Sequence, residues 1–411
     1  MITDRRQDFK SSTTRHIMYS TRVKAGVFLL EALNALSTTC FFYYIYFFTQ
    51  SKYGFDKFQN LLLAAGLGLI YAIGSVLGGR FAQRRGYFRT LKTGFAGMAA
   101  ALGVGSQFDN LSVHLAVTVI CNVAMSLTWP ALEALISEGE PRSRLQNMVG
   151  IYNVVWSLCG ALAYMTGGGM IQSWGLRSLF VVPGLICLVQ LILAFWIEPS
   201  ARAAELPDEG GGIGSGEAGE QPLPSHSPAH SKKFLRMAWL ANPFAYLTIN
   251  TVVAVSPNLA WALHLSPRQA GYFCSIWMFT RTAAFVLFWL WPGWHYRFRW
   301  LLNSYLGMIL CFLTILLAPN LQVLVLSQIG FGLCLGLIYY SSLFYSMDVG
   351  ETKGEHGGIH EAAIGVGSCA GPAIGAAALY FSPAHADNST FAVGALLLLG
   401  LGGLVRLHFR K

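Results

Sequence analysis

Long apolar stretches alternate with short polar ones along almost the whole chain. A helix needs about 20 mostly apolar residues to cross a hydrocarbon core of roughly 30 Å. The segments that approach or exceed this length are 25–48, 58–79, 91–107, 111–136, 147–169, 178–197, 237–263, 270–291, 300–318, 321–347, 357–382 and 389–408. The pattern therefore predicts an all-α polytopic membrane protein with twelve transmembrane helices.

The twelve segments fall into two sets of six. Residues 198–235 lie between the sets and are rich in Gly, Pro, Ser and Glu, with little apolar surface to bury, so we expect a flexible linker. The expected organisation is a cytoplasmic tail over 1–24, a six-helix bundle over 25–197, the linker, and a second six-helix bundle over 236–411. No small-residue cleavage site follows the first apolar run, which favours an uncleaved first helix over a signal peptide.

Positive charge is distributed unevenly between the two sides of this arrangement. Twelve helices place both termini on one side, and with that side in the cytoplasm roughly 23 of the 28 Lys and Arg residues face inward. The outer loops hold only Lys52, Lys57, Arg177 and Arg268. This bias predicts cytoplasmic termini in an inner or plasma membrane, and it explains the net charge of +9 without a nucleic-acid partner.

Composition agrees with a membrane class. Only 11% of the residues are charged, against roughly 25% in soluble domains, and 54% are hydrophobic. All eight cysteines lie inside apolar segments and none forms a C-x-x-C pair, so we interpret them as small core residues.

The loop between the second and third segments carries a spaced motif. Gly79, Gln83, Arg84, Gly86 and Arg89 form G-x-x-x-Q-R-x-G-x-x-R, which resembles the G-x-x-x-D-R-x-G-R-R signature of the major facilitator superfamily. It departs from the family where Gln83 replaces Asp, which removes a charge, and where one Arg of the final pair is missing. The resemblance implies a loop that packs on neighbouring cytoplasmic helix ends and helps to hold one conformation closed. The alternative is that these arginines only anchor a helix end to lipid phosphates.

Further stretches are similar to the same family. Glu138 and Arg144 match its acidic helix end and the arginine-bearing loop that follows, and would belong to the cytoplasmic gate. Two glycine-rich stretches are similar to its antiporter signature, because small residues allow close helix approach and proline permits a bend. These packing residues are Gly160, Gly168, Gly367, Gly371, Pro372 and Gly375. The resemblance implies two six-helix bundles related by an internal repeat, with a central site exposed alternately to each side.

Four charged residues stand out inside the apolar segments, where an unpaired charge costs several kcal/mol, so each is a candidate for function. Arg281 lies near the midplane with no other charge in its segment, and must face a cavity, a carboxylate or an anionic substrate. Glu31, Glu133 and Glu361 are candidates for proton binding. A structural pair with a nearby cation remains open for Glu31, and a cytoplasmic latch remains open for Glu133.

Uncharged polar residues lie in the segments that line the cavity in the resembling family. They are Asn34, Asn122, Asn153, Trp156, Asn250, Asn258, Trp261, Gln328, Tyr339 and Tyr340. Each is expected to contact the cavity or to form an interhelical hydrogen bond. The aromatic run over 41–48 is interpreted mainly as a lipid-facing belt with helix packing, and secondarily as a cavity wall.

The segment around Glu361 also holds His356 and His360, four residues apart. Their spacing is not the H-E-x-x-H of a zinc hydrolase, and we expect neither a metal nor a cofactor. No G-x-x-x-x-G-K-[ST] loop occurs, which argues against ATP-driven transport by this chain alone.

These features together predict an alternating-access secondary transporter rather than an enzyme. Its expected partners are a small organic solute, protons and membrane lipids, and we expect a monomer. The helix signatures favour export, and the midplane cation favours an anionic or amphiphilic, drug-like solute. The substrate and proton pathway is predicted to contain Glu31, Asn34, Glu133, Asn153, Trp156, Asn250, Arg281, Tyr339 and Glu361. Two alternatives are a membrane-embedded enzyme acting on lipid and a non-transporting sensor or scaffold of the same fold.

Overall fold

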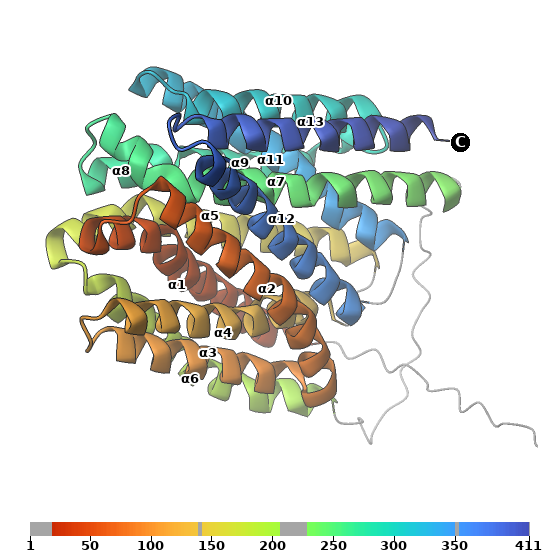
Figure 1. Cartoon of the computed structure of the whole chain (residues 1–411). Helices are drawn as coiled ribbons and strands as arrows, with labels where there is room; N and C mark the ends of the chain where they lie inside the picture. The colour runs from red at the N-terminus through yellow and green to blue at the C-terminus, as the bar shows by residue number, and fades with distance from the viewer. Residues whose placement is uncertain (1–18, 139–141, 206–227, 350–352, 411) are drawn as a thin grey trace, which may run out of the picture.

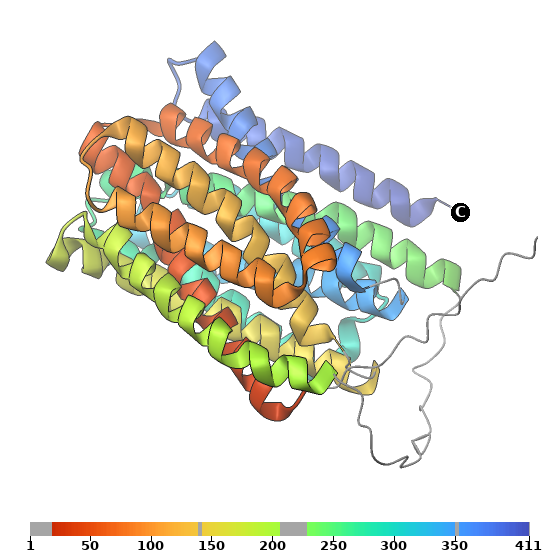
Figure 2. The same ribbon diagram turned by 90° about the horizontal axis from the view of Figure 1, so that it is seen from below.

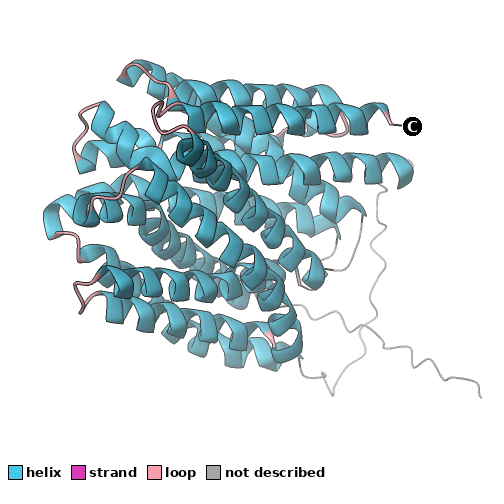
Figure 3. Cartoon of the chain, viewed as in Figure 1, coloured by secondary structure: helices cyan, strands magenta, loops and turns pink. Residues whose placement is uncertain are grey.

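The structure is a computed structural model that describes residues 19–138, 142–205, 228–349 and 353–410. Within these ranges the chain forms α-helices, one short 3-10 helix and connecting loops (Figure 3). The helices of the first half are α1 (Thr21–Tyr53), α2 (Lys57–Arg85), α3 (Tyr87–Gly105), α4 (Leu111–Ser137), α5 (Arg142–Trp174) and α6 (Ser178–Glu205). Those of the second half are α7 (Pro228–Ala262), α8 (Pro267–Cys274), α9 (Ile276–Leu290), η1 (Pro292–Trp294), α10 (Phe298–Leu316), α11 (Leu321–Val349), α12 (Lys353–Phe381) and α13 (Asn388–Phe409).

Eleven spans among the described residues are long and apolar enough to cross a membrane, with α8 and α9 counted as one continuous span. The exception is α3, whose first turns carry Arg89 and Lys92. It nevertheless runs alongside α4 and α6 through the same thickness (Figure 2). The predicted all-helical fold with twelve crossings is therefore confirmed, and the chain is an integral membrane protein.

The two sets of helices form two bundles that lie side by side (Figure 1). The start of α7, the end of α13 and the turn from α2 to α3 lie at one end of the molecule, and α8 lies at the other. The helices reach further into the expected linker than the sequence suggested, since α6 continues to Glu205 and α7 begins at Pro228. Residues 206–227 of the linker and 1–18 of the tail lie outside the described residues.

Polar residues at the helix starts explain where several helices begin. Asp56 and Gln59 form a capping box at α2, and Ser266 and Gln269 form another at α8. Between α2 and α3 the chain turns at Gly86, whose φ of 88° is a conformation that side-chain-bearing residues rarely adopt. This accounts for the second glycine of the loop motif in structural terms.

Lys24 of α1 caps the end of α4. Its buried ammonium donates hydrogen bonds to the carbonyl oxygens of Leu135, Ile136 and Glu138, at 3.1, 2.8 and 3.0 Å. These carbonyls belong to the last helical turn, where intrahelical partners run out and the helix dipole is negative. The start of α1 and the end of α4 are thereby tied together.

The two bundles meet along α2 with α12 and along α5 with α8 and α9, and glycines permit both contacts. A Cβ on Gly168 would collide with the carbonyl oxygen of Pro267, and one on Gly271 would lie 2.6 Å from that of Met165. In the other contact, a Cβ on Gly79 would lie 3.1 Å from the Cα of Gly358.

The remaining packing-motif residues also lie at close contacts. A Cβ on Gly160 would lie 2.9 Å from the terminal methyl of Met278 in the other bundle. Gly367 and Gly371 face the carbonyls of α7, and a Cβ on Gly375 would lie 3.3 Å from Leu61. Together with Pro372 inside α12, these positions agree with the role expected for small residues.

Candidate functional site

A cavity lies between the two bundles, with an empty volume of about 1030 Å³ that includes its opening to solvent. Its lining comes from α1, α2, α4, α5, α7, α9, α11 and α12. Six tyrosines contribute to the lining, namely Tyr43, Tyr46, Tyr71, Tyr152, Tyr246 and Tyr339. A concave site lined mainly by aromatic and apolar side chains, with a few polar groups among them, suits a small organic molecule. Among the described residues, the charged ones that line it are Arg281 and Glu361.

Arg281 is almost completely buried, with 2% of its surface exposed, and lines the cavity from α9. Its guanidinium lies over the rings of Trp156, Trp277 and Phe285, at 4.5, 5.1 and 5.8 Å from their centres. In the described part of the chain it forms no salt bridge, and its Nε atom has no hydrogen-bond partner. Cation–π contacts stabilise the charge, and the guanidinium also forms a side-chain hydrogen bond with Tyr246, while its Nε donor stays open.

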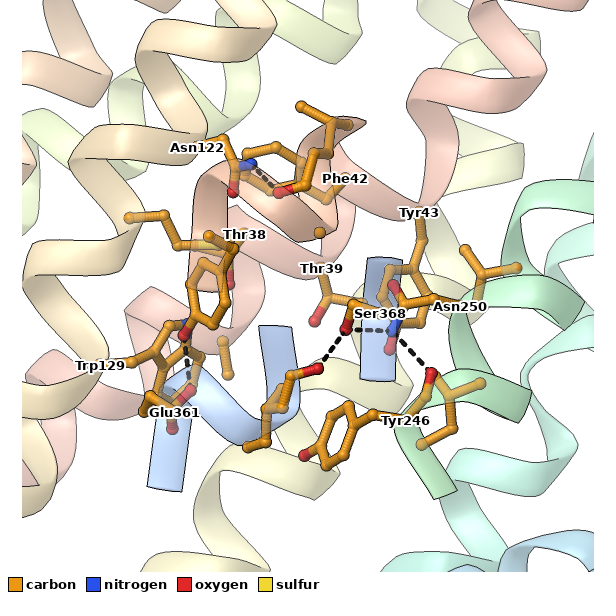
Figure 4. A pocket seen from close by; sticks show the side chains of 18 of the residues that line it. Thr38, Thr39, Phe42, Tyr43, Asn122, Trp129, Tyr246, Asn250, Glu361 and Ser368 are labelled. Carbon is orange, nitrogen blue, oxygen red and sulfur yellow. Dashed lines mark hydrogen bonds between the residues drawn. The ribbon is translucent and has the colours of Figure 1, made fainter. Parts of the chain in front are cut away.

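Polar groups on α7 and α12 lie on the same side of the cavity as Tyr246. The amide of Asn250 donates to the Ser368 hydroxyl at 2.8 Å and to the Tyr246 carbonyl at 3.1 Å (Figure 4). The Tyr246 side chain interacts electrostatically with Arg281. Asn250 is therefore confirmed as a lining residue, and its amide is held by two fixed partners.

Glu361 lies beside Trp129 on the other side of the cavity (Figure 4). The hydroxyl of Tyr71 on α2 donates to its Oε2 atom at 2.6 Å, so this hydrogen bond joins the two bundles. Glu133 of α4 is within electrostatic range of Glu361, and its buried Oε2 atom has no partner among the described residues. Two carboxyl groups that interact in this way do not ionise independently.

Glu31, Asn34, Glu133 and Asn153 were predicted to belong to the pathway, but none of them lines the cavity. Asn34 accepts a hydrogen bond from Thr128, which joins α1 to α4, whereas Asn153 accepts one within α5 from the lining residue Trp156. Glu31 is fully buried, and both of its carboxylate oxygens are without partners in the described residues. The alternative left open for Glu31, a structural pair with a cation, is not seen there.

Trp156 and Tyr339 line the cavity as expected and contact each other edge to face, with 5.5 Å between ring centres. By contrast, the interpretation of 41–48 as mainly a lipid-facing belt is wrong. None of its eight side chains is exposed, and Phe42, Tyr43 and Tyr46 line the cavity. Trp261 lies outside the cavity, with 79% of its surface exposed.

Several lining residues were missed by sequence reasoning, above all Tyr71, Tyr152 and Tyr246. A tyrosine in an apolar segment gives no signal that separates a cavity wall from a packing contact. Only Tyr71 could have been noticed, because it lies in the segment that precedes the loop motif.

The residues of the predicted cytoplasmic gate lie at the ends of α2 to α5. Gln83, Arg84, Arg89 and Arg144 have exposed side chains. Among the described residues, Arg84 and Arg89 form no salt bridge. Glu138 accepts a hydrogen bond from the Tyr19 hydroxyl at 3.3 Å. The contribution of this region to gating stays a prediction.

No group of three or more His, Cys, Asp or Glu residues that could hold a metal ion occurs within the described residues. His360 is buried, with its Nε2 atom unpartnered there, and its ring contacts Tyr339 at 5.6 Å between centres. The His356 side chain lies outside those described.

The sequence matches the family model of the Major Facilitator Superfamily over residues 27–372. The chain belongs to this superfamily. A search of curated proteins found no match.

Several solved structures of transporters share the fold. The human organic anion transporter MFSD10 (TETRAN) superposes with a TM-score of 0.66 and 17% identity, covering 93% of this chain and 99% of that one. A point mutant of the nucleoside transporter NupG gives a TM-score of 0.67 and 13% identity, covering 94% and 100%. A bacterial homologue of the human lysosomal transporter Spinster, inward-facing and unoccupied, gives 0.64 and 13%, covering 94% and 95%. At these identities the likeness concerns the fold alone, which is the fold of major facilitator transporters.

Proposed function

We propose that this superfamily member carries a small organic anion or anionic amphiphile by alternating access, coupled to proton movement. The observation that carries the proposal is the buried guanidinium of Arg281, which lines the cavity without a carboxylate partner among the described residues. A buried cation needs a compensating charge. A solute carboxylate, sulfonate or phosphate would supply it and form paired hydrogen bonds with the planar guanidinium.

The aromatic lining supports an apolar body for this solute. Rings from α1, α4, α5, α7 and α11 surround the cavity, and aromatic faces and edges bind planar apolar groups well. MFSD10, which shares the fold, is an organic anion transporter, and this agrees with the proposed substrate class.

Proton coupling would use the carboxyl groups. Glu361 lines the same cavity as Arg281, and its link to Tyr71 and Glu133 connects the proton state of the cavity to both bundles. A secondary transporter needs such a link, because the ion must bias one conformation over the other. We propose export from a cytoplasm-facing state, on the basis of the glycine-rich stretches of α5 and α12.

The test is reconstitution of the whole chain in liposomes that contain a pH-sensitive dye. Three radiolabelled probes are compared: benzoate as an aromatic anion, tetraphenylphosphonium as an apolar cation, and uridine as a neutral solute. We expect benzoate flux to drive proton movement, with little flux of the other two. Flux of tetraphenylphosphonium but not benzoate would contradict the anionic substrate, and benzoate flux without proton movement would contradict the coupling.

The same vesicles address the two alternatives. A lipid-modifying enzyme would change the lipid composition on prolonged incubation, as measured by mass spectrometry. A sensor or scaffold would bind the probe and show a raised melting temperature without any flux.

A further inference from the structure

The span that carries Arg281 is interrupted. The sequence predicted one helix over 270–291, but α8 ends at Cys274 and α9 begins at Ile276, with Ser275 between them. An interrupted helix leaves backbone N–H and C=O groups without their usual partners, and inside a membrane each such group costs several kcal/mol unless it is satisfied. The interruption lies six residues before Arg281, between the outer surface and the cavity.

A single side chain satisfies backbone groups on both sides of this interruption. Gln328 of α11 donates from Nε2 to the carbonyl oxygen of Phe273 at 2.7 Å. Its Oε1 atom accepts from the backbone N–H of Trp277 at 3.4 Å. A primary amide suits this position because it carries a donor and an acceptor on one planar group. Gln328 is 2% exposed and does not line the cavity.

The helix behind Gln328 is shaped to fit the backbone of α9. Gln328, Gly332 and Gly336 are spaced by four residues and therefore share one face of α11. A Cβ on Gly332 would lie 2.9 Å from the backbone nitrogen of Arg281. A Cβ on Gly336 would lie 3.4 Å from the carbonyl oxygen of Arg281. The two helices thus touch backbone to backbone at the residue that supplies the cation.

Trp277 connects the amide to the guanidinium. Gln328 holds its backbone N–H, while its ring lies under the Arg281 guanidinium at 5.1 Å. A rotation of Trp277 would therefore move one of the surfaces against which the cation rests. Trp277 therefore takes part both in the hydrogen bonding at the helix interruption and in the packing that orients the Arg281 guanidinium.

We propose that Gln328 is a positioning residue for the anion site, which fixes the direction in which α9 presents Arg281 to the cavity. The proposal rests on the function proposed above, in which Arg281 binds the solute anion. Gln328 determines how well the site holds its anion, through the Trp277 backbone and ring. Gly332 and Gly336 keep α11 close enough to α9 for the Gln328 amide to reach the Phe273 carbonyl and the Trp277 N–H.

The test replaces Gln328 in the full-length protein. Gln328→Leu removes both hydrogen bonds, and Gln328→Glu retains only an acceptor for the Trp277 N–H. Gln190→Leu is the matched control, because Gln190 is also fully buried and also bonds to a backbone carbonyl, that of Leu30, but lies in the other bundle. For benzoate uptake we expect Gln328→Leu to raise KM by about tenfold, since small displacements of a positioning group have effects of this order or larger.

The conservative variant and the control sharpen this expectation. Gln328→Glu should give an intermediate KM, with kcat changed less than KM in both variants. Gln190→Leu should lower the melting temperature as much as Gln328→Leu does, yet leave KM for benzoate unchanged. Equal KM values for Gln328→Leu and the wild type would overturn the proposal.

A second readout does not require transport. Phenylglyoxal modifies guanidinium groups, and peptide mass spectrometry gives its rate of reaction at Arg281 in detergent-solubilised protein. We expect Gln328→Leu to change this rate by about threefold or more, since a helix freed at Ser275 presents the guanidinium differently. Gln190→Leu should match the wild type. If the wild type does not carry benzoate, the proposed substrate fails while this measurement still decides the role of Gln328.

A pair of glycine variants covers the case in which Gln328→Leu does not fold. Gly332→Ala would push α11 off the backbone of α9, whereas Gly330→Ala meets only the sulfur of Cys311, at 2.8 Å. Gly332→Ala should reproduce the change in phenylglyoxal reactivity, and Gly330→Ala should not. Wild-type reactivity in Gly332→Ala would count against the proposal.

Discussion

Arg281 and Glu361 both line the cavity, but their surroundings differ in kind. Arg281 is enclosed by aromatic rings, which stabilise a positive charge but cannot neutralise it. Glu361 receives a hydrogen bond from Tyr71 and interacts with a second carboxyl group, that of Glu133. One side of the cavity therefore holds a permanent charge and the other a charge that a proton can remove. Such a division suits a carrier that binds an anion and a proton in one chamber.

The largest expected effect comes from removing the permanent charge. Arg281→Ala should lower kcat/KM for benzoate by about 100-fold, because a charge-assisted hydrogen bond contributes about 1.5–3 kcal/mol. Its melting temperature should stay close to that of the wild type, since no carboxylate in the described residues loses a partner. Arg406→Ala, which removes an exposed cation from the last turn of α13, is the control and should transport normally. Normal transport by Arg281→Ala would remove the basis of the comparison.

Removing the titratable charge should change the pH response more than the affinity. We expect Glu361→Gln to lower the rate by about tenfold and to abolish its dependence on pH between about 5 and 8, as for the loss of a proton-transferring group. Glu31→Gln removes a carboxyl group of similar burial away from the cavity. If both variants lose their pH dependence equally, proton binding is not confined to the cavity side. If neither does, nor Glu133→Gln, the proposed coupling is wrong.

A smaller effect is expected from the hydroxyl that joins the bundles. Tyr71→Phe keeps the ring in the wall and removes only the 2.6 Å hydrogen bond to Glu361. We expect transport to fall by about threefold to tenfold, in line with about 1 kcal/mol for one hydrogen bond. Tyr46→Phe is the control within the same lining. The measurement is the initial rate of benzoate uptake at fixed pH.

The smallest effect is expected where a charged pair lies in water. The hydrogen bond from Lys52, in the last turn of α1, holds the pKa of Asp109 in the loop between α3 and α4 below its usual value. A lowered carboxyl pKa stabilises the fold above the unfolded-state pKa of about 4 and loses this contribution as the pH falls through the folded value. Asp109 is fully exposed, so Asp109→Asn should leave the melting temperature at about pH 7 unchanged within error. A clear loss of stability would show that exposed charges matter here as much as buried ones.

The fold could be predicted from sequence because the bilayer restricts which structures can span it. Length of apolar segment and placement of cations fix the crossings and their order, and even α3 was found despite Arg89 and Lys92. The two charged lining residues, Arg281 and Glu361, could also be found, since a charged residue inside an apolar segment is costly and therefore a candidate for function.

Which other residues line the cavity depends on how the helices pack, and a single sequence does not show that packing. Aromatic residues make up 13% of the chain, so Tyr71 and Tyr246 could not be told apart from packing residues before the bundles were in place. Position relative to the cavity likewise separates Glu31 from Glu361, although the two look equivalent in sequence. The interruption at Ser275 has neither Gly nor Pro beside it, and a partner on another helix maintains it.

The contact between Gly168 and the Pro267 carbonyl has a consequence for the working cycle. Any side chain at position 168 would prevent the close contact between α5 and α8, because the Pro267 carbonyl occupies the space that its Cβ needs. In the alternating-access cycle proposed above, a step that moves these ends apart would leave the same side chain unobstructed. The population of the two states could therefore be tuned by the size of one residue, far from both the anion and the proton.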